Sequence, residues 1–318
     1  MSAQRRWSGA PLGRMAVIGV GQIGGSVALG ARVAGAVTEV VAWSRTRDKL
    51  ERAQALGIID RVAKSTAEAA RGAGVVVLAT PVRSLGDAAA AIAKELDDKA
   101  LVFDVGSVKG AAIASVEPKL RPGAYVPCHP IAGTERVGPD AASPLLFEGK
   151  RCVICPTPRS NETAVATIER LWTALGAEPV RMTAELHDRV FGAGSHLPHV
   201  AAYALAAALG QLAPDVIDGI RRLPTSSLRD TTRVAASSPA MWRDIFLENR
   251  AALAPFIERL AACLDELAGA IRAEVLPLIE ALGARLNELR AAVAAGDADK
   301  IEKVLIAGKA GRDRVIAG

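Results

Sequence analysis

A histidine and a serine in two separate polar segments are the side chains best suited to acid–base chemistry. Ser107 lies in DVGSVK (104–109) and His129 begins HPIAGTE (129–135), and each segment directly follows an apolar run. In an open parallel sheet, ligands bind at the carboxyl ends of the strands, so both side chains should lie where a cofactor and a substrate meet. A histidine there can take the proton of a hydroxyl as hydride leaves the same carbon. The alternative is a loop histidine that hydrogen-bonds to the backbone.

A glycine-rich segment indicates the cofactor. Residues 19–26 read GVGQIGGS, the pattern G-x-G-x-x-G, between the apolar run 15–18 and a stretch of helical composition. In this pattern the first glycine permits a tight turn, the second a close approach of the pyrophosphate, and the third close packing of helix on strand. The helix N-terminus offers its amides to the phosphates. We therefore expect a bound dinucleotide, contacted by Gly19, Gly21, Gln22, Ile23 and Gly24.

The end of the next apolar run, 39–43, bears on which dinucleotide binds. Sites for NAD usually carry an Asp or Glu about 20 residues after the glycines, where it holds the ribose hydroxyls. This chain has Ser44, Arg45 and Arg47 in that region instead. A hydroxyl and two guanidinium groups favour a 2′-phosphate, so NADP is the expected cofactor and NAD the alternative. If both arginines are only solvated at a helix start, this preference disappears.

Two further groups of residues are weaker candidates. His196 and His199 lie three residues apart on one helical face, but no third ligand is evident, so no metal site is expected. Either Arg229 or Arg233 could bind a substrate carboxylate, or serve in a structural ion pair.

The composition places these motifs in a folded protein of about two domains. The chain has 318 residues, of which 50% are hydrophobic and 23% charged, which excludes disorder. Four cysteines, two of them in CVIC (152–155), cannot form a disulfide scaffold, and the CVIC pair is expected to be ordinary thiols. The net charge of +5 contains no Lys/Arg run longer than two, so attraction of anionic metabolites explains it better than nucleic-acid binding.

The order of apolar and amphipathic stretches predicts an α/β fold, a Rossmann-type dinucleotide-binding domain (14–182) followed by an all-helical domain (183–318). Strands are expected at 15–19, 39–43, 74–80, 100–105, 125–128 and 151–155, alternating at first with helices at 24–34, 46–56, 85–96 and 110–120. The second domain is rich in Ala, Leu and Arg, with helices expected at 184–213, 241–270, 272–292 and 298–312. Pro277 should kink the third of these helices or mark its first turn.

The N-terminal segment superficially resembles a secretory signal, because basic residues precede the apolar stretch 15–20. That stretch, however, runs directly into the glycine-rich turn. No apolar run reaches the 18 or so residues of a membrane span. We therefore expect a cytoplasmic protein without a membrane partner.

Seven motifs, in order, resemble the TyrA family, the prephenate and arogenate dehydrogenases of tyrosine biosynthesis. They span residues 19–249 and read GVGQIGGS, LATP, DVGSVK, HPIAGTE, SHLPH, RDTTR and MWRDIFLEN. The resemblance implies oxidative decarboxylation of prephenate, of arogenate or of both, with hydride transfer to NAD(P). It also implies a homodimer formed through the helical domain. It does not distinguish the two substrates, which differ only in a keto or an amino group.

The resemblance further implies roles for individual residues. His129 matches the catalytic histidine at the C4 hydroxyl of the substrate, and Ser107 matches a serine that supports this histidine and the nicotinamide. Arg233 matches the arginine that binds a substrate carboxylate. The remaining matches line the substrate pocket at Thr134, Glu135 and His199, the cofactor site at Thr80 and Pro81, and supporting positions at Asp230 and Trp242.

Several departures from the family pattern bear on these expectations. Members that use NAD carry Asp where this chain has Ser44. Ser226 and Ser227 replace glycines that often precede RDTTR, so this loop can adopt another conformation. HPIAGTE continues with RVG (136–138) where Lys-Ser-Gly is common. Neither an ACT regulatory domain nor a chorismate mutase domain is expected in the chain.

Three alternatives remain open. Another oxidoreductase of this architecture, such as a 3-hydroxyacid dehydrogenase or an imine reductase, would need a catalytic lysine on the helical side, and residues 184–250 contain none. A non-catalytic dinucleotide sensor would keep the glycine-rich turn but have little use for His129, Ser107 and Arg233 together. A helical interaction module with a vestigial first domain is disfavoured by the intact glycine motif.

Overall fold

The computed structural model describes residues 6–133 and 136–295 of the chain. The chain divides into two compact units, Met1–Phe256 and Ile257–Gly318. Of the second unit, the structure describes the part of helix α12 (Arg250–Ala295) that follows Phe256. All seven sequence motifs lie in the first unit, so the candidate site is built within it.

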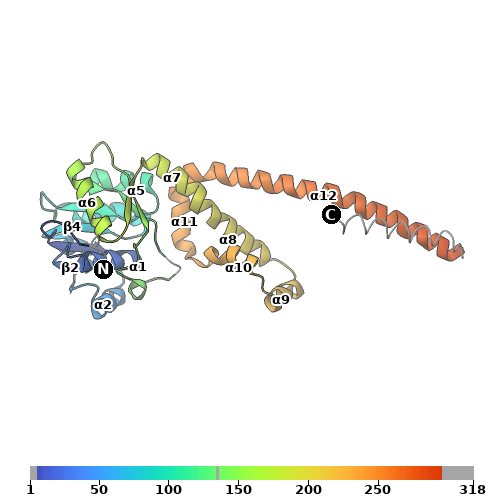
Figure 1. The fold of residues 1–318 in the computed structure, drawn as a ribbon, viewed down its shortest axis with the longest axis horizontal. Coiled ribbons are helices and arrows are strands. Elements are labelled where there is room, and N and C mark those ends of the chain that lie inside the picture. Colours follow the sequence, from blue (N-terminus) through green and yellow to red (C-terminus); the bar gives the residue numbers. More distant parts are fainter. Residues whose placement is uncertain (1–5, 134–135, 296–318) are drawn as a thin grey trace. The chain divides into compact units, whose positions relative to one another are not determined.

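The first unit is organised around a six-stranded parallel sheet (Figure 1). The strands are β1 (Arg14–Ile18), β2 (Glu39–Trp43), β3 (Arg61–Val62), β4 (Ala73–Leu78), β5 (Leu101–Asp104) and β6 (Tyr125–Val126). They lie in the order β3-β2-β1-β4-β5-β6, and every neighbouring pair is parallel. This is the Rossmann order, so the predicted fold class is confirmed. The order reverses between β1 and β4, where ligands bind at the carboxyl ends of the strands.

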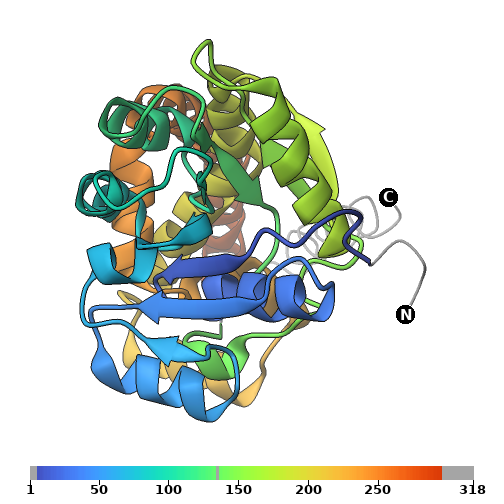
Figure 2. The ribbon, with the colours of Figure 1, turned by 90° about the vertical axis from the view of Figure 1, so that its left-hand side faces the viewer.

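Helices cover both faces of this sheet (Figure 2). They are α1 (Gln22–Val33), α2 (Arg47–Ala55), α3 (Thr66–Ala70), α4 (Leu85–Ile92) and α5 (Lys109–Val116). Successive side chains of β1 alternate between two cores, with Met15 and Val17 in one and Ala16 and Ile18 in the other. Burial on both faces explains why the central strands are apolar throughout.

A second, three-stranded sheet carries His129. Strand β7 (Cys128–Pro130) pairs antiparallel with β8 (Arg151–Ile154), which pairs parallel with β9 (Glu178–Arg181). The run 125–128, expected as one strand, divides at Pro127 between β6 in the large sheet and β7 in the small one. Proline has no N–H to donate to a strand ladder, which accounts for the break. His129 therefore follows directly after the junction of the two sheets.

Among the described residues, six strands and α-helices were not predicted from the sequence: β3, β9, α3, α6 (Glu162–Ala174), α9 (Pro214–Arg222) and α10 (Ser226–Thr232). The strand β3 has only two residues, and β9 contains Pro179, which argues against a strand. Helix α6 begins after Asn161, whose side chain accepts hydrogen bonds from the N–H groups of Thr163 and Ala164. This is a typical N-cap, and it marks the start of a helix that the apolar runs of the sequence do not reveal.

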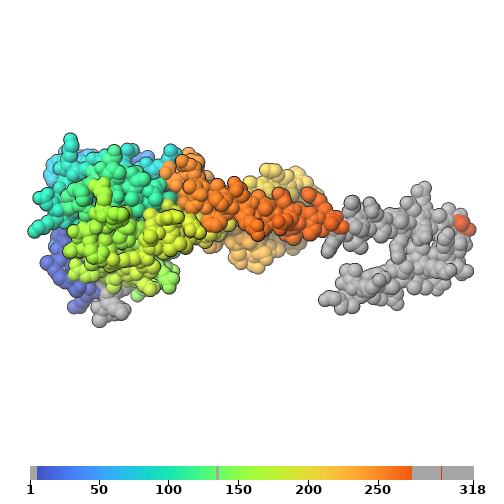
Figure 3. All heavy atoms as spheres, turned by 90° about the horizontal axis from the view of Figure 1, so that it is seen from above, coloured from blue at the N-terminus to red at the C-terminus, as the bar shows by residue number. Residues whose placement is uncertain are grey.

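The helical part of the first unit begins at α7 (Ala184–Phe191) and passes through a π-helical turn (Gly192–His196) into α8 (Leu197–Leu209). The helices α9 (Pro214–Arg222), α10 (Ser226–Thr232) and α11 (Pro239–Glu248) follow. Helix α7 packs against the sheet-bearing part. In the space-filling view its yellow-green atoms adjoin green ones (Figure 3), and Asp188 of α7 accepts a hydrogen bond from Lys109 N.

The boundaries of these helices differ from the predicted ones. The stretches 241–270 and 272–292 fall in α11 and in the single helix α12, which passes through Pro277 and does not begin there. The segment with Ser226 and Ser227 is the start of α10, capped by Thr225. The helix expected at 298–312 lies outside the described residues.

Within the described ranges, no single helix is both long and apolar enough to cross a membrane. Residues 184–209 and Pro214–Arg222 meet that description only as a pair, bent by 118° at the break between them.

A buried ion pair joins the end of β5 to the start of α5. Lys109 Nζ lies 2.5 Å from Asp104 Oδ2, and both side chains are fully buried. The carboxylate of Asp104 also accepts hydrogen bonds from Tyr125 Oη and Cys128 N, and Lys109 donates to Cys128 O. The pair therefore ties β5 and β6 to the start of β7, directly before His129.

We expect Lys109→Met to lower the free energy of unfolding by about 3–5 kcal/mol, because it leaves the Asp104 carboxylate buried without its cation. Urea unfolding followed by circular dichroism measures this loss. The matched control is Lys99→Met, at an exposed position, which should change stability by no more than about 0.5 kcal/mol. Equal stabilities of the two variants would contradict the importance of the pair.

Candidate active site

The turn from β1 into α1 leaves room for a phosphate group. Gly19 has a φ of +103°, and a Cβ at this position would lie 2.5 Å from Ala79 O. A Cβ on Gly24 would lie 2.3 Å from Gly19 O, whereas a Cβ on Gly21 would project into open space. Helix α1 has neither a side-chain cap nor an acidic residue in its first turn. Its N-terminal amides are therefore available to an anion.

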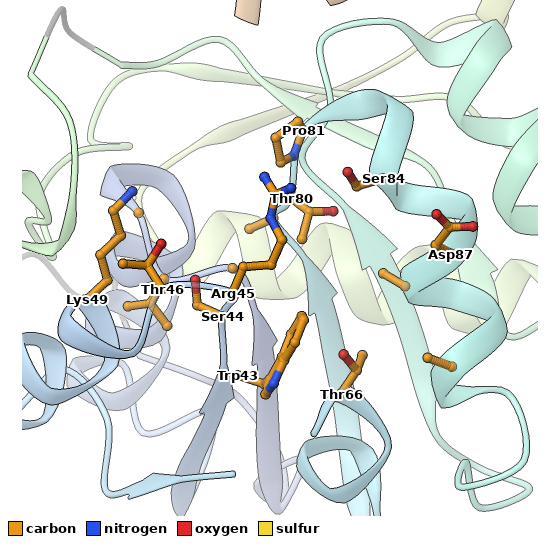
Figure 4. Close-up of a pocket in the computed structure, with 16 residues that line it drawn as sticks. Trp43, Ser44, Arg45, Thr46, Lys49, Thr66, Thr80, Pro81, Ser84 and Asp87 are labelled. Carbon is orange, nitrogen blue, oxygen red and sulfur yellow. The ribbon is translucent and has the colours of Figure 1, made fainter. Parts of the chain in front are cut away.

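A cavity of about 520 Å³ opens on this turn (Figure 4). Its lining includes Gly19, Gly21, Trp43, Ser44, Arg45, Thr46, Lys49, Thr80, Pro81 and Asp87. Thr80 Oγ1 is buried and has no hydrogen-bond partner among the described residues, so this hydroxyl is available to a ligand. The open position at Gly21, the uncapped helix and the unpaired hydroxyl together fit a dinucleotide.

Two cations face the cavity near the end of β2. Figure 4 shows Arg45 and Lys49 extending beyond Ser44 to the same side of the strand ends. Neither forms an ion pair with another residue of the described part of the chain. Among the residues lining the cavity, the only carboxylate is that of Asp87, on α4. The local charge at the end of β2 is therefore positive.

The expected cofactor residue Arg47 does not line this cavity. Its Nε lies 2.8 Å from Oε1 of Glu51, one turn along α2, and its side chain is 80% exposed. Lys49, which sequence reasoning did not single out, takes its place at the cavity. The signal that could have found it is position, because Lys49 lies in the first turn of the helix that directly follows the end of β2.

His129 begins a chain of three hydrogen-bonded side chains. Its Nδ1 lies 2.8 Å from Nε2 of His187, and Nδ1 of His187 lies 2.7 Å from Oδ1 of Asp188. The ring of Phe191 packs against both imidazoles, with centroids 4.8 Å from His129 and 4.5 Å from His187. His187, Asp188 and Phe191 all belong to α7. The first helix of the helical part therefore completes the surroundings of a histidine on β7.

The surroundings keep both imidazoles neutral near pH 7. Burial lowers the pKa of His129 well below its usual range, and His187 and the charge of Lys109 lower it further. Burial also lowers the pKa of His187, against the opposing effect of Asp188. Burial alone would raise the pKa of Asp188, but hydrogen bonds from His187 and from the N–H groups of Lys109 and Gly110 outweigh it, and the pKa is lowered. The neutral base His129 is thus linked through neutral His187 to a largely buried carboxylate that is ionised.

The other two histidines of the chain's four lie in the same region. Asn249 Nδ2 is 2.9 Å from both Asp188 O and Nδ1 of His196. The ring of His199 stacks on Trp242 with centroids 3.5 Å apart, and His196 meets the same indole at 5.9 Å. Burial lowers the pKa of His196 to about 4 and also lowers that of His199. One continuous set of contacts therefore joins all four histidines.

Comparison with known proteins identifies the family. Residues 27–181 match the model of the prephenate dehydrogenase nucleotide-binding domain, and residues 183–282 match that of the prephenate dehydrogenase dimerization domain. The cyclohexadienyl dehydrogenase of Zymomonas mobilis is 37% identical over 260 residues, which cover 82% of this chain and 89% of that protein. The chain belongs to the prephenate dehydrogenase family.

Other members of the prephenate dehydrogenase family agree with this assignment. A prephenate dehydrogenase from Aquifex aeolicus, solved with hydroxyphenyl propionate and NAD+, is 34% identical, with a TM-score of 0.78 over 91% of this chain and 100% of that one. Synechocystis arogenate dehydrogenase is 26% identical, with a TM-score of 0.68 over 87% of this chain and 98% of that one. The prephenate dehydrogenase of Bacillus subtilis is 32% identical over 235 residues, which cover 73% of this chain and 63% of that protein. The resemblance predicted from the seven motifs is confirmed.

The remaining residues expected from the prephenate dehydrogenase motifs lie in different surroundings. Ser107 is in the turn between β5 and α5, and within the described residues its hydroxyl makes no hydrogen bond. Arg233 directly follows α10 and is close enough to His199 for its charge to contribute to the lowered pKa of that imidazole. Thr134 and Glu135 lie outside the described residues. Among the described residues, no three His, Cys, Asp or Glu side chains are grouped to hold a metal ion.

Sequence reasoning missed His187, Asp188 and Asn249 in this prephenate dehydrogenase site. His187 and Asp188 lie outside the motifs, and Asn249 ends the MWRDIFLEN motif without a role assigned to it, because the partners of the three residues are 58, 79 and 53 residues away along the chain. A usable signal was present, however. A chain with only four histidines makes each of them a candidate.

The lowered histidine pKa values predict that acid destabilises the protein. Below pH 6.5 the unfolded chain binds protons that the folded chain does not, so the free energy of unfolding falls as the pH falls. With the pKa of His196 at about 4, this residue alone should remove about 1.5 kcal/mol between pH 6.5 and 5, because the loss rises toward about 1.4 kcal/mol per pH unit as the unfolded histidine becomes protonated.

Urea unfolding at both pH values, for the wild type and for His196→Gln, measures this contribution. We expect the variant to lose less stability on acidification than the wild type does. An unchanged pH dependence would show that His196 is not held neutral in the folded protein.

Proposed function

We propose that this chain catalyses the oxidative decarboxylation of prephenate, arogenate or both, in tyrosine biosynthesis. The observation that carries the proposal is His129, a neutral imidazole that follows the carboxyl end of β6. A residue of α7, His187, holds its ring by a hydrogen bond. The relatives named above act on prephenate, arogenate or cyclohexadienyl substrates, which supports this substrate class.

The reaction needs a general base and correct alignment of the reactants, because aromatisation already supplies its thermodynamic driving force. Prephenate and arogenate are cyclohexadienols with a carboxylate on the ring carbon opposite the hydroxyl. When bound, the nicotinamide dinucleotide accepts hydride from the hydroxyl-bearing carbon. The bond to the ring carboxylate then breaks, its electron pair enters the ring, and CO2 leaves. Because the ring becomes aromatic, the reaction is strongly downhill, and the protein mainly orients the reacting groups.

His129 takes the hydroxyl proton as the carbon–oxygen double bond forms, and it returns that proton to the phenolate oxygen after CO2 has left. A base with a pKa well below 6.5 is unprotonated at neutral pH and ready for the first step. Arg233 binds a carboxylate of the substrate, with His199 beside it, since the two side chains influence one another electrostatically. Ser107 lies in the turn before Lys109, where its unpaired hydroxyl supports a role in binding the substrate hydroxyl or the nicotinamide.

The cofactor we propose is NADP, bound with its 2′-phosphate at the end of β2. Ser44, Arg45 and Lys49 support it, because they provide a hydroxyl and two unpaired cations at the cavity. NAD binding would lack the carboxylate that grips both ribose hydroxyls. The carboxylate of Asp87, on α4, lies across the cavity from Ser44 and Lys49 (Figure 4).

We also propose that the protein is a cytoplasmic homodimer formed through its helical part. The match to a dimerization-domain model supports the dimer. Large apolar side chains on the helices also support it, since they are exposed by 39–78% at Leu205, Leu212, Val216 and Leu223.

For the catalytic role we expect His129→Asn to lower kcat by roughly 10²–10⁴-fold, the usual contribution of a general base. Binding of the dinucleotide, measured by fluorescence titration, should be unchanged. Turnover close to that of the wild type would show that another group removes the proton.

For the cofactor we expect kcat/KM to favour NADP over NAD by at least about tenfold, equivalent to 1.4 kcal/mol. Steady-state rates with the four combinations of prephenate or arogenate and NADP or NAD measure this preference and the substrate preference together. Ser44→Asp should shift the preference toward NAD, because its carboxylate repels a 2′-phosphate and binds the ribose hydroxyls.

Two further variants locate the phosphate. Lys49→Met should reduce kcat/KM for NADP and leave that for NAD nearly unchanged, whereas Arg47→Met should have a smaller effect because Arg47 is paired with Glu51. A wild type that favours NAD tenfold would overturn the NADP proposal.

A further inference from the structure

The second histidine in the chain of hydrogen bonds, His187, has no role in the mechanism described so far. It lies between His129 and Asp188, and each of its ring nitrogens is bonded to one of them, at 2.8 Å and 2.7 Å. It is fully buried on α7, and its ring packs on Phe191. Such a residue either fills space or determines where the protons of its neighbour lie.

The position of Asp188 is itself determined by α5. Oδ1 of Asp188 accepts a hydrogen bond from Lys109 N and Oδ2 one from Gly110 N, both at 2.8 Å. These are the first N–H groups of a helix that has no side-chain cap of its own. A Cβ on Gly110 would lie 2.8 Å from Oδ2, so a glycine is needed for this close approach. The carboxylate is thus an acceptor in a constrained position, stabilised at a helix N-terminus.

Because Asp188 can only accept, one arrangement of protons is possible along the hydrogen bonds from Asp188 through His187 to His129. The ionised Asp188 can only accept, so Nδ1 of His187 carries a proton and donates it. Neutral His187 then has a lone pair on Nε2, which accepts from Nδ1–H of His129. The lone pair of neutral His129 is therefore on Nε2, which makes no hydrogen bond within the described residues. The reverse arrangement would direct the lone pair of His187 Nδ1 at the carboxylate.

We propose that His187 and Asp188 are positioning residues that hold His129 in the tautomer with its proton on Nδ1 and its basic lone pair on Nε2. A carboxylate that selects the tautomer of a catalytic histidine is known from Ser-His-Asp triads, where it is worth about 10⁴ in kcat. Here a second imidazole lies between the carboxylate and the base. The same hydrogen bonds stabilise the imidazolium that forms when His129 takes the substrate proton, because Nδ1–H of His129 still has His187 Nε2 as its acceptor.

The inference rests on the proposed function for its catalytic consequence, but the tautomer is a property of the free protein. Long-range ¹H–¹⁵N NMR at pH 7.5 on ¹⁵N-histidine-labelled full-length protein reports it without substrate or cofactor. Only four histidines contribute, and His129→Asn identifies the signal of His129. We expect the proton of His129 on Nδ1 in the wild type. A proton on Nε2 would overturn the proposal, whether or not the protein oxidises prephenate.

Two variants of equal length separate hydrogen bonding from packing. The amide of His187→Gln can accept from Nδ1 of His129, whereas the side chain of His187→Met fills similar space without a comparable acceptor. We expect His187→Met to lower kcat by roughly 10–10²-fold, which is less than the loss of the general base itself would cause, with KM nearly unchanged. Its His129 signal should shift toward the Nε2–H form. His187→Gln should recover most of the activity and the Nδ1–H signal.

Gly110→Ala provides an independent test, because it displaces the Asp188 carboxylate without altering either imidazole. It should change the His129 tautomer and kcat in the same direction as His187→Met. Equal kcat values and equal His129 tautomers in the wild type, His187→Met and Gly110→Ala would show that His187 and Asp188 only fill space and cap α5.

Discussion

The candidate site depends on one buried ion pair, between Asp104 and Lys109. Neither side chain has access to water, so the carboxylate and the ammonium must satisfy one another and their remaining hydrogen bonds within the protein. Those bonds go to Gly106 N, to Tyr125 of β6 and to both backbone groups of Cys128 on β7. The carboxyl ends of β5 and β6 in the large sheet are therefore fixed relative to the start of β7 in the small sheet. His129 is the next residue in the chain, and its location follows from that constraint.

The same stretch of chain also sets the electrical environment of the base. The charge of Lys109 opposes protonation of His129, while the backbone N–H of Lys109 and that of Gly110 hold Asp188 as a carboxylate. The turn after β5 and the start of α5 thus provide a cation that opposes protonation of the base, and their N–H groups hold the carboxylate of Asp188, on α7, in its ionised form. The DVGSVK motif has this double function because it ends a strand and begins a helix.

The sequence predicted the parts of this site that depend on local rules. The limits of β2 are those of its apolar run, and the turn at Gly19, Gly21 and Gly24 has the geometry that the glycine spacing requires. Features that depend on distant partners could not be predicted in this way. The division at Pro127 reflects pairing with two different sheets, and His187 acquires its place only when α7 packs beside α5. The helix boundaries after residue 183 were wrong because Ala- and Leu-rich sequence gives little periodic contrast between one long helix and two short ones.

The clustering of all four histidines has a consequence for the protein as a whole. Histidine is the side chain whose ordinary pKa places its charge change between pH 5 and 8. In this fold each histidine has a lowered pKa, so below pH 6.5 the folded protein binds fewer protons on these side chains than four free histidines would. Its net charge of +5 therefore rises less on mild acidification than it would with free histidines. Long-range attraction of an anion, which depends on that charge, is correspondingly less sensitive to pH.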